Sequence, residues 1–290
     1  MRGPMNYNRI NNIAGVLLLL GFVGVLYVFW ARPCLLHWGA TDKEINMSMP
    51  GDELDPAPAF LATRAITIEG TPEEIWPWLV QMGYVRAGFY GYDILENLGS
   101  PRGIRSAEHI LPEFQNFKVG DEVPISAFFS LNFYALEPNR YVIWSDRKGT
   151  GGFTWALYAI DERHTRLVSR IRWTHHWAQP GMLALDLFTE FTDHLAVRKV
   201  LQGVKDRVEK QTEPMIWQNL EFAAYVTTLS IFLLAMALTI RHRLTLKRWF
   251  AACAAGIAWL AVWYGPVPAW AGAFIVIPVV WSLRNAFRQT

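Results

Sequence analysis

The 290-residue sequence has little cysteine and little charge. Its two cysteines, Cys34 and Cys253, are too few for a disulfide framework. Charged residues make up 18% of the chain, against roughly 25% in ordinary soluble proteins, and the net charge is only +2. A charge this small creates no field that would attract nucleic acid or an acidic partner, so we expect neither. The low charge, together with 52% hydrophobic residues, indicates a membrane protein.

Motifs of covalent and cofactor chemistry are also missing from the sequence. There is no Ser-His-Asp set, no Gly-rich phosphate loop and no redox cysteine motif. His175 and His176, with Asp193 and His194, have the residue types of a metal site, but their spacing fits no defined motif. We therefore expect no metal, no cofactor and no covalent catalysis.

Long apolar runs are what the sequence has in excess, and they lie at its two ends. Residues 13–30 form an uncharged run of about 18 residues, enough to cross a bilayer core. A secretory signal would have a shorter apolar part, so we interpret residues 1–32 as an uncleaved anchor. Residues 217–290 are predicted to be a second membrane region. Its spans are expected at about 222–240, 249–264 and 268–283, although the last two segments could instead form a re-entrant pair.

Basic residues predict how these segments are oriented. The loop at 241–248 contains Arg241, Arg243, Lys247 and Arg248, and short loops rich in Lys and Arg stay in the cytoplasm. We therefore predict a multi-pass cell-membrane protein with both termini in the cytoplasm and the intervening domain outside it.

Residues 59–212 have the patterns of a folded domain, and residues 33–58, which lack periodicity, are predicted to be a linker. Alternation over 62–68 predicts a strand. Thr71 and Glu74 around Pro72 have the pattern of a capping box, so a helix follows and ends at Gly83. Further strands are predicted at 122–128, 131–137, 141–145, 153–160 and 165–173, with short turns that favour an antiparallel meander.

Residues 182–210 place apolar side chains at spacings near three and four, which predicts a long amphipathic helix. A strand, a helix, a meander and a long final helix make an α+β domain whose curved sheet can wrap that helix. Between sheet and helix we expect an apolar interior. Alternation directs Phe153, Trp155, Leu157, Ile171 and Trp173 toward it.

Several of these segments resemble one known family. They are residues 63–68, 71–83, 89–99, 110–114 with 118–121, and 199–207. The stretch from about 60 to 210 is similar to the START-like (SRPBCC) superfamily, in its polyketide cyclase and lipid-transport branch. The resemblance implies a helix-grip fold around a hydrophobic cavity that takes up a lipid or another apolar small molecule. The predicted membrane segments lie outside it.

The candidate ligand-binding residues fall in two groups. Tyr90, Tyr92, Asp93, Glu96 and Asn97 could place polar groups at the mouth of an apolar pocket, or could simply pack and cap a rigid corner. The inner-face residues Phe153, Trp155, Ile171 and Trp173 form the second group.

The sequence is compatible with three functions. The first is a membrane-anchored binder of an apolar molecule. The second is an enzyme of the polyketide cyclase type, acting on an apolar cyclic substrate with Asp93, Glu96 or a histidine of the cavity as acid or base. The third is a non-enzymatic membrane interaction or scaffold protein, whose surface binds a partner that the sequence does not name and whose cavity is filled by its own Phe and Trp side chains. Arg166, Arg170 and Arg172 share one strand face, which is either a solvated outer surface or an anion contact near lipid headgroups.

Overall fold

The computed structural model describes residues 21, 24–25, 27–97, 105–173, 181–211, 215–241 and 284. The chain divides into two compact units, Phe29–Glu213 and a second that combines Met1–Val28 with Pro214–Thr290. The larger unit begins at Phe29, ahead of residue 59, where the sequence pattern placed the start of the domain.

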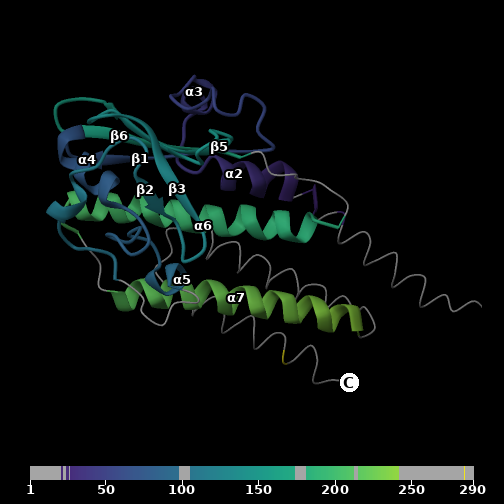
Figure 1. Cartoon of the computed structure of the whole chain (residues 1–290). Helices are drawn as coiled ribbons and strands as arrows, with labels where there is room; N and C mark the ends of the chain where they lie inside the picture. The colour runs from purple at the N-terminus through teal and green to yellow at the C-terminus, as the bar shows by residue number, and fades with distance from the viewer. Residues whose placement is uncertain are drawn as a thin grey trace, which may run out of the picture. The chain divides into compact units, whose positions relative to one another are not determined.

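A six-stranded antiparallel sheet, in the order β1-β6-β5-β4-β3-β2, is the frame of the larger unit (Figure 1). Its strands are β1 (Phe60–Glu69), β2 (Glu122–Pro124), β3 (Ser130–Glu137), β4 (Tyr141–Ser145), β5 (Gly151–Ala159) and β6 (His164–Trp173). Strands β2 to β6 pair in sequence order, which confirms the predicted meander. Strand β2 is shorter than predicted: it ends at Pro124, whose nitrogen cannot donate to a strand ladder.

Helix α4 (Pro72–Gln81) begins at the predicted capping box. Thr71 Oγ1 accepts a hydrogen bond from Glu74 N at 3.4 Å, and Glu74 Oε2 accepts one from Thr71 N at 2.8 Å. The apolar side of the helix is fully buried at Ile75 and Leu79. Two short helical turns, α5 (Asp93–Glu96) and η2 (Pro112–Phe114), lie between α4 and β2 in the chain.

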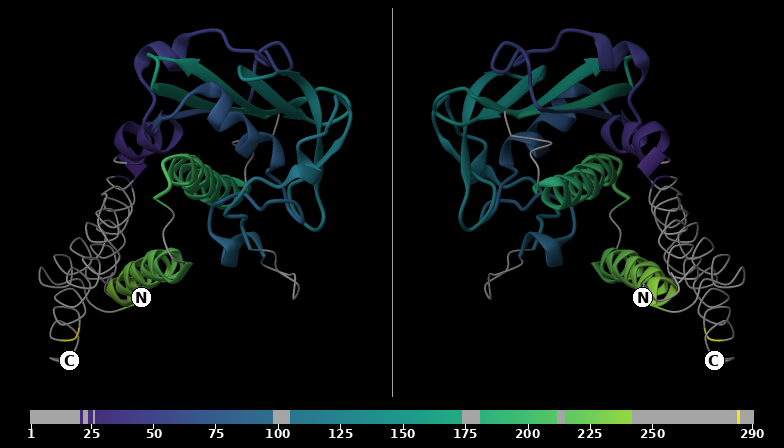
Figure 2. Two further views of the ribbon diagram at one scale, coloured as in Figure 1. Left: turned by 90° about the vertical axis from the view of Figure 1, so that its left-hand side faces the viewer. Right: turned by 90° about the vertical axis from the view of Figure 1, so that its right-hand side faces the viewer.

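Helix α6 (Leu183–Val208) is the long helix predicted at 182–210. The sheet arches over it, and α6 packs against β1, α4 and the short helix α2 (Arg32–Leu36) (Figure 2). Val197, Leu201 and Val204 bury the apolar side of its C-terminal half. An antiparallel sheet curved around one long helix is the predicted α+β, helix-grip arrangement.

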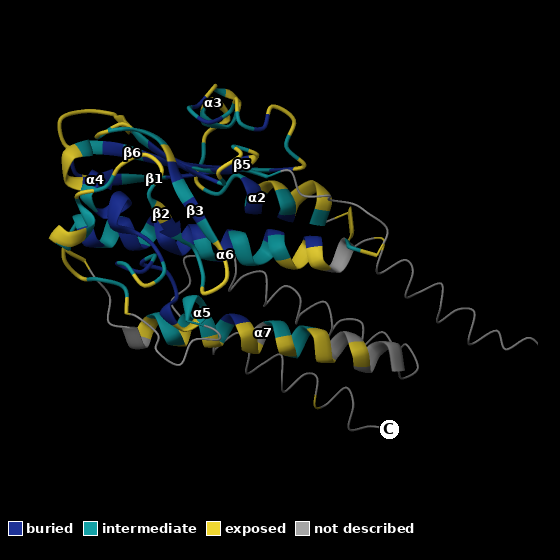
Figure 3. Ribbon diagram, in the orientation of Figure 1, coloured by how far each residue is buried: buried dark blue, intermediate teal, exposed yellow. Residues whose placement is uncertain are grey.

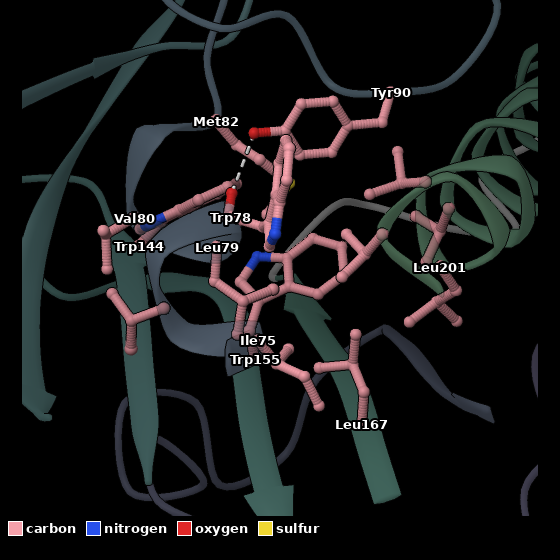
Figure 4. Close-up of a cluster of buried hydrophobic side chains, with 14 of the residues drawn as sticks. Ile75, Trp78, Leu79, Val80, Met82, Tyr90, Trp144, Trp155, Leu167 and Leu201 are labelled. Carbon is pink, nitrogen blue, oxygen red and sulfur yellow. Dashed lines mark hydrogen bonds between the residues drawn. The ribbon is translucent and has the colours of Figure 1, made fainter. Parts of the chain in front are cut away.

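The core lies between the inner face of the sheet, α4 and α6. Buried residues follow α4 and the strands, whereas the first turns of α6 carry exposed side chains such as Leu185 and Phe188 (Figure 3). Bulky aromatic residues fill much of this core, and Trp144 and Trp155 belong to the same buried cluster as Ile75, Leu79 and Leu201 (Figure 4). The interior of the domain is therefore strongly apolar.

The segment predicted to be a linker is instead folded. Its first part, α2, packs against α6 and β1, whereas the part from α3 (Asp42–Asn46) onward lies on the outer face of the sheet, and α3 begins with its own capping box at Thr41 and Glu44. The segment's carbonyl and carboxylate oxygens bind the arginines of β6. Arg170 donates to Met47 O at 2.8 Å and to Asp52 Oδ2 at 2.8 Å, and Arg172 donates to Asp55 O at 2.9 Å.

These contacts correct the interpretation of the arginine face as a solvated surface. Arg170 is only 3% exposed, and Arg166 forms an ion pair with Glu44 at 2.6 Å. Residues 33–58 are held in place by contacts with residues far away in the sequence. Their fold therefore leaves no periodic pattern in the segment itself.

Of the second unit, the structure describes mainly α7 (Met215–Arg241), which contains the apolar run at 222–240. A π-helical turn, η1 (Tyr27–Ala31), leads into α2. Among the residues that the structure describes, no helix is both long and apolar enough to cross a membrane. The segments predicted to span at 249–264 and 268–283, and most of that at 13–30, lie outside the described residues.

Candidate functional site

Tyr90 anchors the aromatic loop that follows α4. Its side chain is fully buried, its hydroxyl donates to Trp78 O at 3.0 Å, and Gln81 Nε2 donates to that hydroxyl at 2.9 Å. The guanidinium of Arg207, from α6, lies 4.3 Å from the centre of the ring. Burial raises the pKa of Tyr90, so the phenol stays neutral and joins α4 to α6.

The two acids of this loop bind backbone N–H groups. Asp93 Oδ1 accepts hydrogen bonds from Ser106 N at 3.2 Å and from Ser106 Oγ at 2.7 Å. Glu96 accepts hydrogen bonds from Phe89 N and Gly91 N, each at 3.1 Å. Burial raises the pKa of Glu96 to about 7, and the nearby Asp93 adds to the increase.

The other two candidates of this loop are also held by local contacts. Tyr92 is 3% exposed, with the Lys199 ammonium 5.5 Å from its ring centre, and Asn97 closes α5 with a hydrogen bond from its N–H to Asp93 O at 3.0 Å. The structure thus brings the first group of candidates together as a rigid corner. Contact of these residues with a ligand stays a prediction.

The second group of candidates lies where alternation placed it. Phe153, Trp155, Ile171 and Trp173 share the inner face of β5 and β6, and Phe153 lies directly opposite Ile171. Trp155 and Ile171 belong to the main core cluster, and Phe153 and Trp173 pack against it. Whether these residues contact a ligand also remains a prediction.

A row of polar groups interrupts this apolar inner face. Trp155 on β5 pairs with Ser169 on β6, and Ser169 pairs with Arg64 on β1, so the three side chains lie side by side. Trp144 on β4 lies directly opposite Phe153 and therefore diagonally from Trp155, and it extends the row with its ring centre 5.6 Å from that of Trp155. All four residues are 2% exposed or less.

Each of the four members of the polar row has a polar atom with no hydrogen-bond partner. These atoms are Trp144 Nε1, Trp155 Nε1, Ser169 Oγ and Arg64 Nη2. A buried polar group without a partner costs about 1–3 kcal/mol, and native proteins keep few of them. Adjacent unpaired groups on an apolar face are the arrangement expected of a site that receives a polar atom of a ligand or a water molecule.

Arg64 joins the polar row to α6. Its Nε donates to Leu35 O at 2.8 Å, and His194 Nδ1 lies 3.0 Å from the same oxygen. Arg64 Nη1 lies 2.8 Å from Asp193 Oδ2, which makes an ion pair without the alignment of a hydrogen bond, and Nη2 has no partner. This cluster places a guanidinium and a carboxylate at the edge of the apolar interior.

Burial controls the ionisation of the α6 members of this cluster. Burial raises the pKa of Asp193, and the positive charge of Arg64 opposes the increase. Burial and the charge of Arg64 lower the pKa of His194 to about 3, so its imidazole is neutral at physiological pH. The ion pair of Arg64 and Asp193 therefore lies beside a neutral histidine.

Sequence reasoning overlooked Arg64, Trp144 and Ser169 as site residues, although a signal existed for two of them. Arg64 alternates with Ile66 and Ile68, and Ser169 falls between Leu167 and Ile171 on the face predicted to be buried. A polar residue in an otherwise apolar alternation marks a buried polar group, which is more informative than an apolar one. Nothing in the sequence marked Trp144, because a tryptophan that points inward is usual in a hydrophobic core.

Metal ligation gains no support from the described part of the chain, in which no group of three His, Cys, Asp or Glu residues could hold an ion. His175 and His176 lie outside it. The structure also has an open surface hollow lined by charged residues, among them Glu69, Glu74, Arg163 and Glu209. It contains none of the predicted site residues, and its charged lining does not suit an apolar molecule.

No protein-family model and no curated protein matches the sequence. Several solved structures are similar to it. A conserved protein of unknown function from Enterococcus faecalis is 14% identical, with 62% of this chain and 95% of that chain covered and a TM-score of 0.28. A polyketide-cyclase-like protein from Corynebacterium glutamicum is 12% identical, with 51% and 91% covered and a TM-score of 0.31.

The self-sacrificing resistance protein CalC from Micromonospora echinospora is 11% identical, with 52% of this chain and 95% of that chain covered and a TM-score of 0.33. Likenesses this weak do not assign a function. The description of the fold rests on the sheet order and the long helix of the chain itself.

Proposed function

We propose that this protein is a membrane-anchored START-like domain that binds a lipid or another apolar small molecule between its sheet and α6. The observation that carries the proposal is the set of unpaired polar groups on the apolar inner face, Trp144 Nε1, Trp155 Nε1 and Ser169 Oγ. Small-molecule sites are mostly apolar, with a few polar groups that fix the orientation of the ligand. The inner face has both features.

Membrane anchoring is part of the same proposal and is supported by the sequence. The uncharged run at 13–30, most of which lies outside the described residues, is long enough to cross a bilayer core, and the basic loop at 241–248 favours a cytoplasmic position. This arrangement places the domain outside the cytoplasm and both termini inside. Anchoring would keep the binding site close to a membrane source of apolar molecules.

No contact in the described residues favours the polyketide-cyclase type of enzyme. Its proposed acid and base, Asp93 and Glu96, accept hydrogen bonds from Ser106, Phe89 and Gly91 and hold the loop in place. The scaffold interpretation makes a different physical claim, namely that the aromatic core fills the interior completely. The same experiment therefore tests it.

Native mass spectrometry of the full-length protein, released from native membrane discs, tests the proposed function. We expect a bound apolar molecule in a fixed ratio to the protein, which organic extraction removes. A protein that is consistently empty, under conditions in which a known lipid-binding protein keeps its ligand, would contradict the proposal and favour the scaffold interpretation.

A further inference from the structure

The chemistry of the polar row restricts what can occupy the interior. An indole N–H only donates hydrogen bonds, and the row has two of them without partners, on Trp144 and Trp155. Ser169 Oγ can donate as well, and Arg64 Nη2 adds another donor without a partner beside it. A site composed mainly of donors is complementary to an acceptor, and in an apolar molecule that acceptor is an oxygen atom.

Charge decides which kind of oxygen fits. Arg64 already faces the carboxylate of Asp193, with Nη1 and Oδ2 2.8 Å apart, and Glu190 of the same helix pairs with Arg32 at 2.7 Å. A ligand carboxylate at the row would place a second anion near Asp193 in a buried environment, where repulsion between like charges is strong. A neutral carbonyl oxygen accepts the same hydrogen bonds without that repulsion.

Burial and register show where the rest of the molecule would lie. Phe153 and Ile171 form the next directly opposed pair along β5 and β6 after Trp155 and Ser169, on the same face. The side chain of Phe153 packs at the edge of the core cluster, and Trp173 lies beyond it, next to Phe129, with their ring centres 5.9 Å apart. An apolar body that extends from the polar row toward Trp173 would meet only apolar side chains on these two strands.

We propose that the interior selects apolar molecules that carry a neutral carbonyl oxygen, such as a ketone or an ester, and that Trp155 and Ser169, which lie directly opposite each other, donate hydrogen bonds to its two lone pairs. The proposal rests on the proposed function and adds the chemical class of its ligand. The proposal also explains why the inner face contains the polar row, since a face that binds only hydrocarbon would need no polar groups.

A pair of probes of equal shape tests this selection. The ketone 2-dodecanone and the alkene 2-methyl-1-dodecene differ in one group, C=O in place of C=CH2. Both are added together, at equal concentration, to the full-length protein in lipid nanodiscs, and the ratio of bound ketone to bound alkene is read by native mass spectrometry. The two probes partition differently into the bilayer, but this difference is the same for every variant in the same lipid. It therefore cancels when the ratios of the variants are compared.

The variants remove one donor at a time and keep the packing. Trp155→Phe keeps an aromatic ring without an N–H, and Ser169→Ala keeps nearly the volume of the side chain. We expect each to lower the ketone-to-alkene ratio about threefold to tenfold, as the loss of one neutral hydrogen bond predicts. Trp76→Phe is the matched control, because Trp76 is a tryptophan of the same core on α4 whose indole N–H is not among the unpaired atoms. It should leave the ratio unchanged.

The possible results separate the two proposals. If the wild-type protein binds both probes and the ratio is the same in all variants, the selection for carbonyl oxygen is wrong and the proposed function stands. If Trp76→Phe shifts the ratio as much as Trp155→Phe, the effect comes from packing and the selection is again wrong. If the wild-type protein binds neither probe, the proposed function itself is contradicted.

Discussion

Single polar residues give the interior of this domain its character. Arg64, Ser169 and His194 are each 1% exposed, in positions that face the apolar core. Burying such groups is unfavourable unless they find partners, and Arg64 Nη2 and Ser169 Oγ have none. The inner face thus carries a cost in stability that a bound molecule with a suitable acceptor would reduce.

His194 should make the domain less stable as the pH falls. Its pKa is lowered from 6.5 to about 3 in the folded protein, so between these values the unfolded chain binds a proton that the folded chain does not. Stability from this residue is complete above pH 6.5 and is lost as the pH falls toward 3. The slope is at most about 1.4 kcal/mol per pH unit.

Thermal unfolding of the full chain at pH 7, 6 and 5 measures this effect. His194→Asn keeps a donor near the position of Nδ1, which faces Leu35 O, and does not titrate. The midpoint of the wild-type chain should fall more steeply than that of the variant. Because Asp193 and Glu96 titrate in both chains, parallel curves would show that His194 is not the group responsible.

At the scale of elements, sequence patterns predicted the strands and long helices well, because these depend on local alternation and capping. The strand at 141–145 and the capping box at Thr71 agree with the structure, and the meander order followed from short turns. The fold of residues 33–58 could not be predicted in this way. It depends on Arg170 and Arg172, which are more than a hundred residues away in the chain.

Arg170 should control whether that segment stays on the sheet. Its guanidinium donates to Thr63 Oγ1, to Asp52 Oδ2 and to three backbone carbonyls of residues 44–47. Because Arg170 is 3% exposed, Arg170→Met leaves these oxygens without their buried partner, and we expect a loss of roughly 3 kcal/mol of stability. Hydrogen exchange over residues 42–55 should also become faster.

The matched control for Arg170→Met is Arg163→Met. Arg163 forms an ion pair with Glu69 but its side chain is 76% exposed, so its removal should cost less than about 1 kcal/mol. Equal losses in the two variants, or unchanged exchange over 42–55, would refute the role given to Arg170.

Gly203 sets how closely α6 approaches the loop of Tyr90. A Cβ added there would lie 2.0 Å from Tyr90 O, which is a backbone atom and cannot move aside cheaply. Gly203→Ala should therefore destabilise the domain, although alanine in a helix interior is normally favoured over glycine by about 1 kcal/mol. A higher unfolding midpoint for Gly203→Ala would contradict the close packing, and Gln202→Ala serves as a neighbouring control.

At the scale of the whole molecule, labelling of single cysteines tests the predicted membrane topology. In a chain with Cys34→Ala and Cys253→Ala, a cysteine introduced at the exposed Lys148 should react with a membrane-impermeant maleimide on intact spheroplasts. A cysteine at Lys247, in the basic loop, should react only after permeabilisation. The reverse pattern would overturn the proposed orientation and place the domain in the cytoplasm.

The role of the site was less predictable than the fold. Alternation placed Phe153, Trp155, Ile171 and Trp173 on the inner face, but the acids Asp93 and Glu96 turned out to bind loop backbone. The polar row depends on the register between β5, β6 and β1. Pairing of Trp155 with Ser169 and of Ser169 with Arg64 follows from the folded sheet and from no single segment of sequence.

An apolar molecule should occupy the interior beside the polar row. An experimental density map of the full-length protein, purified without organic extraction, would show it. We expect elongated density between the sheet and α6, with one end within hydrogen-bond distance, roughly 2.7–3.2 Å, of Trp155 Nε1. An interior closed by the protein's own side chains, or one with isolated water molecules alone at Trp155 and Ser169, would contradict it.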